Sequence, residues 1–190
     1  MRPLVILDLD ETLICAVERS ENRSIDLPER CESYRLRKRF GPYWIYPRPG
    51  LQEFLSKLFK KYRVAVWTAA GSSYAMFVIH TFLLRRGRSL EFIQWSAHCD
   101  RSEEMFDHQK KLAMLKGIEK GPTVLLDDAE HVRQSQTNVV DSRCWDVRQE
   151  GAEEDDFLVS DALPEIERKL RIQRNRKSSS KSRKSRSKSR

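Results

Sequence analysis

The sequence predicts an α/β fold in which helices flank a parallel β-sheet. Three short apolar runs carry this prediction: Leu4–Leu7, Arg63–Trp67 and Pro122–Leu126. Runs of leucine, valine and isoleucine without polar alternation are typical of strands that are buried on both faces, as in parallel sheets. Helical patterns separate the three runs, and strands that alternate with helices form parallel α/β sheets.

The segment between the first two runs predicts two further strands and a helix. Tyr43–Tyr46 is aromatic and β-branched, which favours a strand, and Pro47–Gly50 ends it. Leu51–Phe59 has apolar residues at i, i+3, i+4, i+7 and i+8, the pattern of an amphipathic helix. We expect Ser33–Phe40 to form a hairpin strand and the polar stretch before it, from residue 15 onward, to be a loop.

The remaining chain continues the alternation. Helical patterns cover residues 72–85, 108–116 and 158–172, and shorter apolar runs predict strands at 90–95 and 139–140. At 190 residues, the chain is long enough for one domain with a sizeable core.

Charge is distributed unevenly along the chain. Residues 173–190 hold nine of the 36 lysines and arginines and none of the 28 acids. The rest of the chain, with 27 basic and 28 acidic side chains, has a net charge of −1, although the whole chain carries +8. We therefore predict a domain at residues 1–172 and a disordered basic tail at 173–190, because lysine, arginine and serine bury too little surface to fold.

The tail leaves several roles open. Its positive charge suits an electrostatic, salt-sensitive contact with nucleic acid or a nuclear-import signal, and the alternative is a solubilising extension without a partner. The four cysteines and four histidines show no metal-site spacing, and no apolar run is long enough to span a membrane. We expect a soluble, intracellular monomer without membrane contact, with the nucleus as the favoured compartment.

Reactive side chains follow each of the three apolar runs. Asp8 and Asp10 follow the first, Thr68 the second, and Asp127 and Asp128 the third. The carboxyl ends of parallel strands lie at one edge of a sheet, so these groups can meet. Carboxylates held close together repel unless a cation or a shared proton lies between them, and Mg²⁺ prefers such oxygen ligands. The alternatives are a helix cap for the first pair and a solvated turn for the last.

This constellation predicts phosphoryl transfer. Asp8 would attack phosphorus and form an aspartyl-phosphate, while Asp10 protonates the leaving oxygen and then activates water. The expected Mg²⁺ ligands are Asp8, Asp10 (through its backbone), Asp128 and the neighbouring Asp127.

Further groups are expected to bind the phosphate itself. Thr68 and the main-chain N–H groups of the turn at Ala69 would contact phosphate oxygens, and Lys110 would balance the transferred charge. A threonine at a strand end and a lysine on a helix surface are also common without such roles.

Several motifs resemble those of one family. DLDETL at 8–13 resembles the first motif of the haloacid dehalogenase superfamily, in the variant of the FCP/SCP-type (NLI-interacting-factor-like) phosphatases. WTAA at 67–70 resembles the second motif, and Asp127-Asp128 the fourth, although Ala-Glu follows here where Ser-Pro is frequent. YPRPG at 46–50 resembles the Arg-Pro turn before the first helix of that family.

The lysine motif has an ambiguous register. Gln109-Lys110-Lys111-Leu112 resembles the stretch in which a lysine precedes an acid and a leucine, but Lys111 stands in the place of the acid. The resemblance therefore implies that the functional lysine is Lys110 or Lys111.

The resemblance implies a Rossmannoid, haloacid-dehalogenase-like fold and a Mg²⁺-dependent protein serine/threonine phosphatase that acts on phosphoproteins, among them the RNA polymerase II C-terminal domain (CTD). About forty residues separate Thr68 from Lys110, too few for a large cap domain. An open site of this kind favours phosphoserine or phosphothreonine in an extended peptide. Two alternatives remain: a phosphatase acting on nucleic-acid ends, and a non-enzymatic scaffold, whose expected mark is loss of Asp8 or Asp10.

Overall fold

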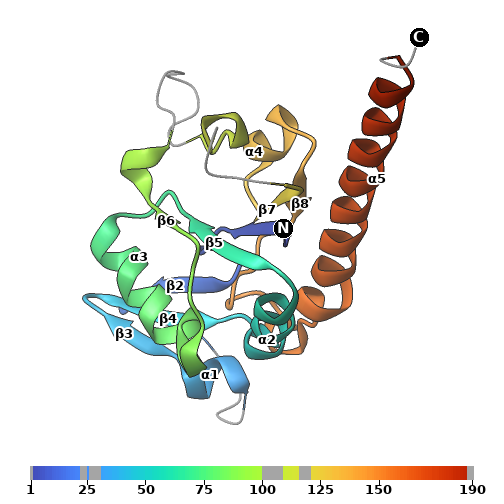
Figure 1. The fold of residues 1–190 in the computed structure, drawn as a ribbon. Helices are drawn as coiled ribbons and strands as arrows, with labels where there is room; N and C mark the ends of the chain where they lie inside the picture. The colour runs from blue at the N-terminus through green and yellow to red at the C-terminus, as the bar shows by residue number, and fades with distance from the viewer. Residues whose placement is uncertain (1, 22–24, 26–30, 100–108, 116–120, 188–190) are drawn as a thin grey trace.

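The computed structural model describes residues 2–21, 25, 31–99, 109–115 and 121–187, with the backbone alone for residues 86 and 177–187. A five-stranded, all-parallel sheet forms its centre, and helices cover the sheet on both faces (Figure 1). The strands lie in the order β6 (Ile93–Gln94), β5 (Arg63–Trp67), β1 (Leu4–Leu7), β7 (Thr123–Asp127) and β8 (Val139–Asp141). This arrangement confirms the predicted fold class.

The central strand β1 brings the three predicted strand ends level. Leu7 pairs with Val66 of β5 on one side and with Leu126 of β7 on the other. Residues that follow these strands therefore emerge side by side at the carboxyl edge of the sheet.

A second, three-stranded antiparallel sheet lies beside the carboxyl edge. Its order is β2 (Ile14–Glu18), β4 (Tyr43–Pro47) and β3 (Lys38–Phe40). The expected loop from residue 15 onward is thus wrong at β2, and the expected strand at 33–40 is half helix, with α1 at Glu32–Leu36. Both errors concern short segments whose structure depends on pairing with the distant β4, and local patterns carry little of that information.

Helices connect the strands. The helical segments are α2 (Leu51–Lys61), α3 (Ser72–Val78), the π-helical η2 (Ile79–Leu83), the 3₁₀ turns η3 (Arg85–Gly87), η4 (Ser96–His98), η5 (Leu112–Leu115) and η6 (Ala152–Glu154), α4 (Glu130–Ser135), the π-helical η7 (Leu158–Ala162) and α5 (Leu163–Ser187). The expected helix at 108–116 is a single 3₁₀ turn within its described part, and the expected strand at 90–95 shortens to β6.

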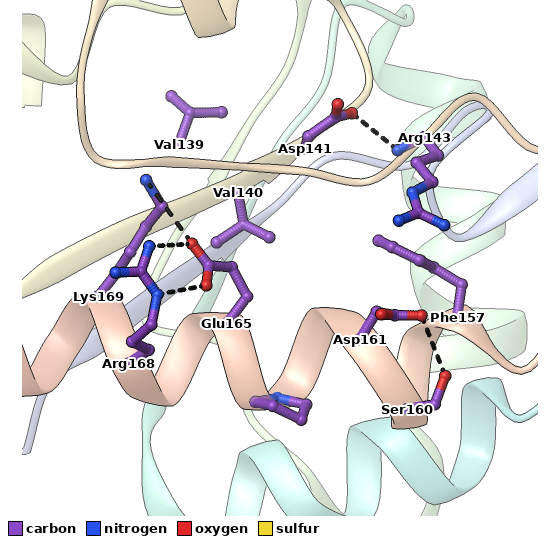
Figure 2. Close-up of a pocket in the computed structure, with 11 residues that line it drawn as sticks. Val139, Val140, Asp141, Arg143, Phe157, Ser160, Asp161, Glu165, Arg168 and Lys169 are labelled. Atoms are coloured by element: carbon purple, nitrogen blue, oxygen red, sulfur yellow. Dashed lines mark hydrogen bonds and ion pairs between the residues drawn. The ribbon is translucent and has the colours of Figure 1, made fainter.

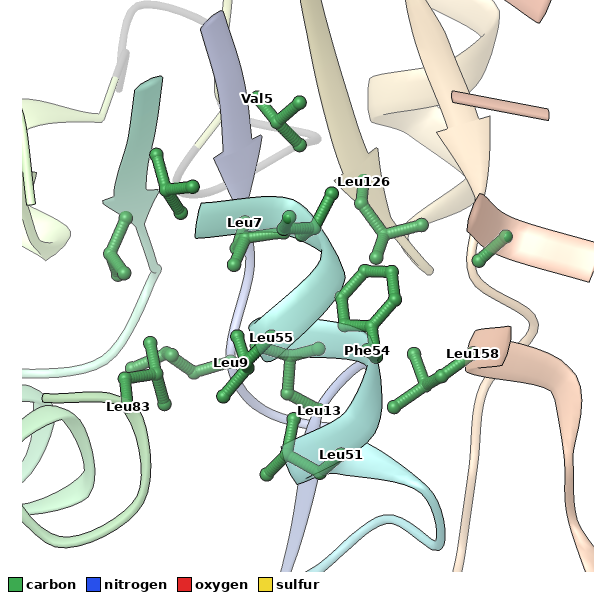
Figure 3. Packing of buried hydrophobic residues seen from close by; sticks show 14 of the residues in the cluster. Val5, Leu7, Leu9, Leu13, Leu51, Phe54, Leu55, Leu83, Leu126 and Leu158 are labelled. Carbon is green, nitrogen blue, oxygen red and sulfur yellow. The ribbon is translucent and has the colours of Figure 1, made fainter. Parts of the chain in front are cut away.

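The core is packed on both faces of β1. Val5 and Leu7 point to one face, where they join Phe54 and Leu55 of α2 (Figure 3). Leu4 and Ile6 point to the other face and join a second cluster. All four residues of β1 are fully buried, which explains the absence of polar alternation in their sequence.

Helix α5 runs along the sheet and beyond it. Lys169 donates to the main-chain oxygen of Thr137, and the Gln173 side chain bonds both the N–H and the C=O of Thr123, the first residue of β7. The helix then continues to Ser187, through most of the segment that the sequence predicts to be a tail, and projects away from the body (Figure 1). Lysine and arginine favour helix, so basic composition does not by itself end it. None of the helices in the described part of the chain has the length and apolar character needed to span a bilayer.

Candidate active site

The end of β1 places Asp8 at the centre of the carboxyl edge. Its main-chain N–H donates to the carbonyl of Leu126 at 3.0 Å, which continues the parallel pairing by one residue. The Asp8 side chain is buried, with 5% of the residue exposed. A carboxylate in this position is fixed by the sheet rather than by a mobile loop.

The end of β7 brings two more carboxylates to Asp8. Oxygen atoms of Asp8, Asp127 and Asp128 lie within 4.8 Å of one another. Asp127 is held by the main-chain N–H of Ala129, which donates to its Oδ1 at 3.0 Å. Three of the predicted site residues thus form one cluster, which we call the carboxylate cluster.

Lys110 lies inside the carboxylate cluster. Its Nζ is 2.5 Å from Asp8 Oδ1 and 2.7 Å from Asp127 Oδ2, and only 4% of the residue is exposed. Burial lowers the pKa of Lys110, but the charges of Asp8 and Asp127 outweigh it and raise that pKa above its ordinary value. Of the two candidate lysines, Lys110 is therefore the one that contacts the carboxylates, and it carries a positive charge at neutral pH.

The sequence did not reveal Gln136, which holds the lysine segment in place. Its side-chain amide donates to the Lys110 carbonyl at 2.6 Å and accepts from the main-chain N–H of Leu112 at 2.8 Å. Gln136 lies between α4 and β8, in a polar stretch that has no local signal for this role.

The electrostatics of the cluster favour a bound cation. Burial raises the pKa of Asp8, Asp10 and Asp128 above the usual range, although Lys110 opposes the rise for Asp8. Among the cluster residues, three carboxylates face one lysine, so one positive charge does not balance them. The donors are all hard carboxylate oxygens, which suit Mg²⁺. The residues present therefore fit a divalent cation of this kind.

Two hydroxyl groups, Thr12 and Ser142, support the cluster. Thr12 Oγ1 lies 3.1 Å from Asp128 Oδ1 and 3.4 Å from Asp8 Oδ2, and 2.9 Å from the Ser142 hydroxyl. Thr12 belongs to the DLDETL motif, so the motif carried a signal for it, whereas Ser142 lies just beyond β8 without such a signal. Together they tie the ends of β1, β7 and β8.

Thr68 stands at the end of β5, buried to 1% exposure. Its Oγ1 accepts a hydrogen bond from the main-chain N–H of Ala70 at 3.0 Å, so the hydroxyl proton can be donated elsewhere. Ala69 is exposed in the turn between them. The position of both residues at the carboxyl edge agrees with a phosphate-binding turn, while that role stays a prediction.

Asp10 lies apart from the carboxylate cluster. Its Oδ1 accepts a hydrogen bond from the Tyr74 hydroxyl at 2.5 Å, and its backbone forms a bridge with Ile14. Both roles expected for Asp10, metal binding through its backbone and proton transfer through its carboxyl group, stay predictions.

Arg48, in the Arg-Pro turn before α2, connects loops next to the site through hydrogen bonds. Its guanidinium forms a bidentate pair with the Asp155 carboxylate, with N–O distances of 2.9 and 3.0 Å. It also donates to the carbonyls of Thr12, Ser142 and Arg143 at 3.2, 2.9 and 3.2 Å. With 2% exposure, Arg48 is an internal cross-link between the loop after β1 and the loop after β8.

A second possible metal-binding group shares one residue with the carboxylate cluster. It consists of Glu11, Asp128 and Cys144, and the Cys144 thiol donates to Glu11 Oε2 at 3.0 Å. Burial, with the Glu11 carboxylate, raises the pKa of Cys144 to about 12, so the sulfur is a protonated thiol at neutral pH. A protonated thiol is a poor ligand, and the all-oxygen cluster is the better cation site.

A cavity of about 540 Å³ lies to one side, between β8 and α5 (Figure 2). Glu165 pairs there with Arg168 and Lys169, and Ser160 donates to Asp161. These charged groups contact one another, and the carboxylate cluster does not line this cavity. The residues that the sequence predicts for the site therefore lie at the edge of the sheet and not in this cavity.

Asp8 and Asp10 follow the central strand of a parallel sheet, Asp127 and Asp128 stand at the end of the neighbouring β7, and Lys110 comes from the segment before η5. This arrangement is that of an α/β protein of the haloacid dehalogenase type. The sequence model of the family described as NLI interacting factor-like phosphatase matches residues 3–177. The chain belongs to this family.

Relatives and solved structures agree with this assignment. The chain is 34% identical to the CTD phosphatase-like protein 355R of Invertebrate iridescent virus 6, over 76% of this chain and 84% of that protein. It is 35% identical to the corresponding protein of Invertebrate iridescent virus 3, over 74% of each chain. The fold is similar to that of the fission yeast RNA polymerase II CTD phosphatase Fcp1 bound to beryllium fluoride, with a TM-score of 0.54 and 24% identity. That match covers 74% of this chain and 41% of Fcp1.

Family membership confirms the predicted family and the predicted class of enzyme, a phosphatase that hydrolyses phosphoric monoesters. A non-enzymatic scaffold would be expected to lack Asp8 or Asp10, and both residues are present in this chain. The division into a domain at 1–172 and a tail at 173–190 stays a prediction.

Proposed function

We propose that the protein is a Mg²⁺-dependent protein serine/threonine phosphatase that forms an aspartyl-phosphate on Asp8. The observation that carries this proposal is the carboxylate cluster, in which Asp8, Asp127 and Asp128 lie close together beside the end of the central strand and Lys110 contacts Asp8 and Asp127.

The first step is attack by an Asp8 oxygen on phosphorus, with departure of the seryl or threonyl oxygen. Lys110 lies next to Asp8 and neutralises charge that develops on the phosphoryl oxygens. Asp8, Asp128 and the backbone of Asp10 would hold a Mg²⁺ ion, which would neutralise charge at the phosphoryl group. Asp127 contributes by binding Lys110, whose orientation it fixes.

Asp10 moves the proton in both steps. As an acid it protonates the leaving oxygen, and as the resulting base it takes a proton from the water that hydrolyses the aspartyl-phosphate. The raised pKa of Asp10, caused mainly by burial, favours the protonated form needed at the start. Thr68 and the N–H groups near Ala69 bind phosphate oxygens at the neighbouring strand end.

We propose phosphoserine or phosphothreonine in an extended peptide as the substrate. Between Thr68 and residue 99, the described chain forms α3, short helical turns and β6, and no separate domain covers the site. The viral relatives are named as CTD phosphatase-like and Fcp1 as a CTD phosphatase, and the polymerase C-terminal domain is therefore the first substrate to test. A nuclear location and a monomeric state belong to the same proposal.

A panel of phosphopeptides tests this function. The wild type and an Asp8→Asn variant are assayed for phosphate release with Mg²⁺ or with EDTA. We expect release by the wild type with Mg²⁺ alone, and none by the variant, because an amide cannot act as the nucleophile. Release in EDTA, or by the variant, would remove the mechanism.

The same assay separates the second candidate, a phosphatase on nucleic-acid ends. A 5′-phosphorylated oligonucleotide is offered beside the peptides at equal concentration. Faster turnover of the oligonucleotide would overturn the proposed substrate while leaving the aspartyl-phosphate mechanism in place. The nine basic residues of 173–190 are the feature that favours this candidate, through electrostatic contact with the nucleic-acid backbone.

A further inference from the structure

Tyr74 makes a contact with the proposed acid that the family-like motifs do not predict. It is the third residue of α3, and its hydroxyl donates to Asp10 Oδ1 at 2.5 Å. The contact links two segments that are 64 residues apart in the chain.

The Tyr74 ring is held independently of Asp10. It packs edge-on against Phe40 of β3, with ring centroids 5.5 Å apart and an interplanar angle of 76°. Phe40 in turn packs against Phe77 of α3, with ring centroids 5.0 Å apart. The three-stranded sheet and α3 therefore fix the hydroxyl group by aromatic packing, and Asp10 must orient toward it.

We propose that Tyr74 is a positioning residue that holds the Asp10 carboxyl group with one oxygen engaged and the other directed to the leaving group. This inference rests on the proposed function, because it concerns the acid step. It also gives the three-stranded sheet a part in the reaction, as the support of the tyrosine.

The division of labour between the two Asp10 oxygens follows from the hydrogen bond. Oδ1 accepts from Tyr74 throughout, so Oδ2 carries the acid proton. As the Asp8–phosphorus bond forms and the bond to the seryl oxygen breaks, Oδ2 gives its proton to that oxygen. In the second step Oδ2 takes a proton from water, whose oxygen bonds phosphorus as the Asp8–phosphorus bond breaks, and inorganic phosphate leaves.

Tyr74→Phe tests the proposal, because it removes the hydroxyl and keeps the ring. We measure kcat/KM, which covers the steps up to departure of the leaving group, on a phosphoserine peptide and on p-nitrophenyl phosphate. A seryl oxygen needs the proton and a nitrophenolate does not. We expect a loss on the order of 10–100-fold on the peptide, the cost of a hydrogen bond to a charged group, and less than about threefold on the aryl ester.

A double-mutant cycle supplies the control. In an Asp10→Asn background, Tyr74→Phe should cause no further loss of kcat/KM on the peptide, because the acid that it positions is gone. Tyr62→Phe, at the end of α2, is the matched control and should behave as wild type. Thermal melts of all variants exclude loss of fold.

Three results would overturn the inference while the proposed function survives. These are equal losses on both substrates, unchanged peptide turnover, and faster turnover, which would mean that Tyr74 holds Asp10 away from the leaving group. If the wild type hydrolyses neither substrate with Mg²⁺, the proposed function fails first, and the role of Tyr74 falls with it.

Discussion

The two ends of the five-stranded sheet differ in how deeply their charged side chains are buried. At the carboxyl end, Asp8, Asp127 and Lys110 are buried and each contacts another charged group at 2.5 to 2.7 Å. At the amino end lie exposed ion pairs such as Lys61 with Glu167. The basic stretch of α5 extends from this second end, because Gln173 bonds the first residue of β7.

The difference concerns how much each charge depends on the fold. Buried charges cost much free energy unless partners are placed around them, so the carboxyl end must be built as a unit. Exposed pairs contribute roughly 0–1 kcal/mol and tolerate change. The comparison predicts large, specific effects of substitution at one end and small, salt-dependent effects at the other.

The largest effect is expected at Lys110. In Lys110→Met, the carboxylates lose their cation, and we expect turnover to fall on the order of 10²–10³-fold, as for loss of a charge-stabilising donor. Stability at pH 7 should fall by about 3–5 kcal/mol, the typical cost of leaving buried charges unpaired. Phosphate release and urea unfolding measure the two effects.

Lys111→Met is the matched control for Lys110, since it changes the neighbouring lysine of the same motif. It should keep near-wild-type turnover, because Lys111 is not among the groups that contact Asp8 or Asp127. A larger effect of Lys111 than of Lys110 would contradict both the site geometry and the contrast between the two ends.

Arg48 tests whether the carboxyl end depends on a buried support. Arg48→Met leaves three main-chain carbonyls and Asp155 without their donor, so we expect a loss of about 3 kcal/mol of stability. The matched control is Arg39→Met in β3, an exposed arginine bonded to the Gly41 carbonyl, which should change stability by less than about 0.5 kcal/mol. Similar urea midpoints for the two variants would show that burial does not set the cost.

The predictability of the site follows the same contrast. The positions of Asp8, Thr68 and Asp127 could be predicted from the sequence, because the first two directly follow buried strands and Asp127 ends one. A parallel sheet brings such strand ends together. Gln136 and Tyr74 could not be predicted, because their roles arise from contacts between segments with no shared local pattern. The motif alone left the lysine register open, and the contacts of Lys110 with Asp8 and Asp127 favour Lys110, whose role stays a prediction.

The fold shows the same limit. Strands buried on both faces, such as β1 and β7, are predicted almost to the residue, since burial imposes their composition. Strand β2 was missed because its pairing with β4 spans a long loop. The tail at 173–190 stays a prediction, because composition indicates how little a segment buries and not which backbone conformation it takes, and α5 extends to Ser187.

The pH dependence of stability gives a third test, with a smaller expected effect. The pKa of Asp8, Asp10 and Asp128 is raised in the folded protein, first by burial, so the folded state binds protons more tightly than the unfolded chain. Stability in EDTA should therefore fall as pH rises above about 4 toward the raised values, by about 1.4 kcal/mol per pH unit for each proton involved. Mg²⁺ should flatten this dependence, because it stabilises the ionised carboxylates.

Asp146→Asn is the opposite control for the pH experiment. Arg148 lowers the pKa of Asp146 by hydrogen bonding, so this group contributes stability that is lost as pH falls. Removing it should make stability in EDTA less sensitive to acid, whereas Asp128→Asn should reduce the loss at higher pH. Urea unfolding between about pH 2 and 8 measures both, because the contribution of Asp146 is lost only below its unfolded pKa of about 4. A wild-type curve identical in EDTA and Mg²⁺ would count against a cation at the cluster.

The smallest effect on catalysis is expected from removing residues 174–190. The cut leaves Gln173 and its bonds to Thr123 in place. β1 spans about 13 Å at ~3.3 Å per residue, and α5 continues about 21 Å from Gln173 to Ser187 at ~1.5 Å per residue. A short phosphopeptide at Asp8 therefore cannot reach the basic end, and its kcat/KM should change less than about twofold.

A single-stranded oligonucleotide should respond differently to the same truncation. If all nine basic residues contact phosphates, the logarithm of the oligonucleotide binding constant should fall with the logarithm of the salt concentration with a slope of about −6. The truncated protein should lose most of this salt dependence. The segment holds no aromatic residue, so binding should not depend on base sequence. Loss of peptide turnover on truncation would show that residues 174–190 contribute to the active site. An unchanged salt dependence of oligonucleotide binding would assign nucleic-acid contact to another surface.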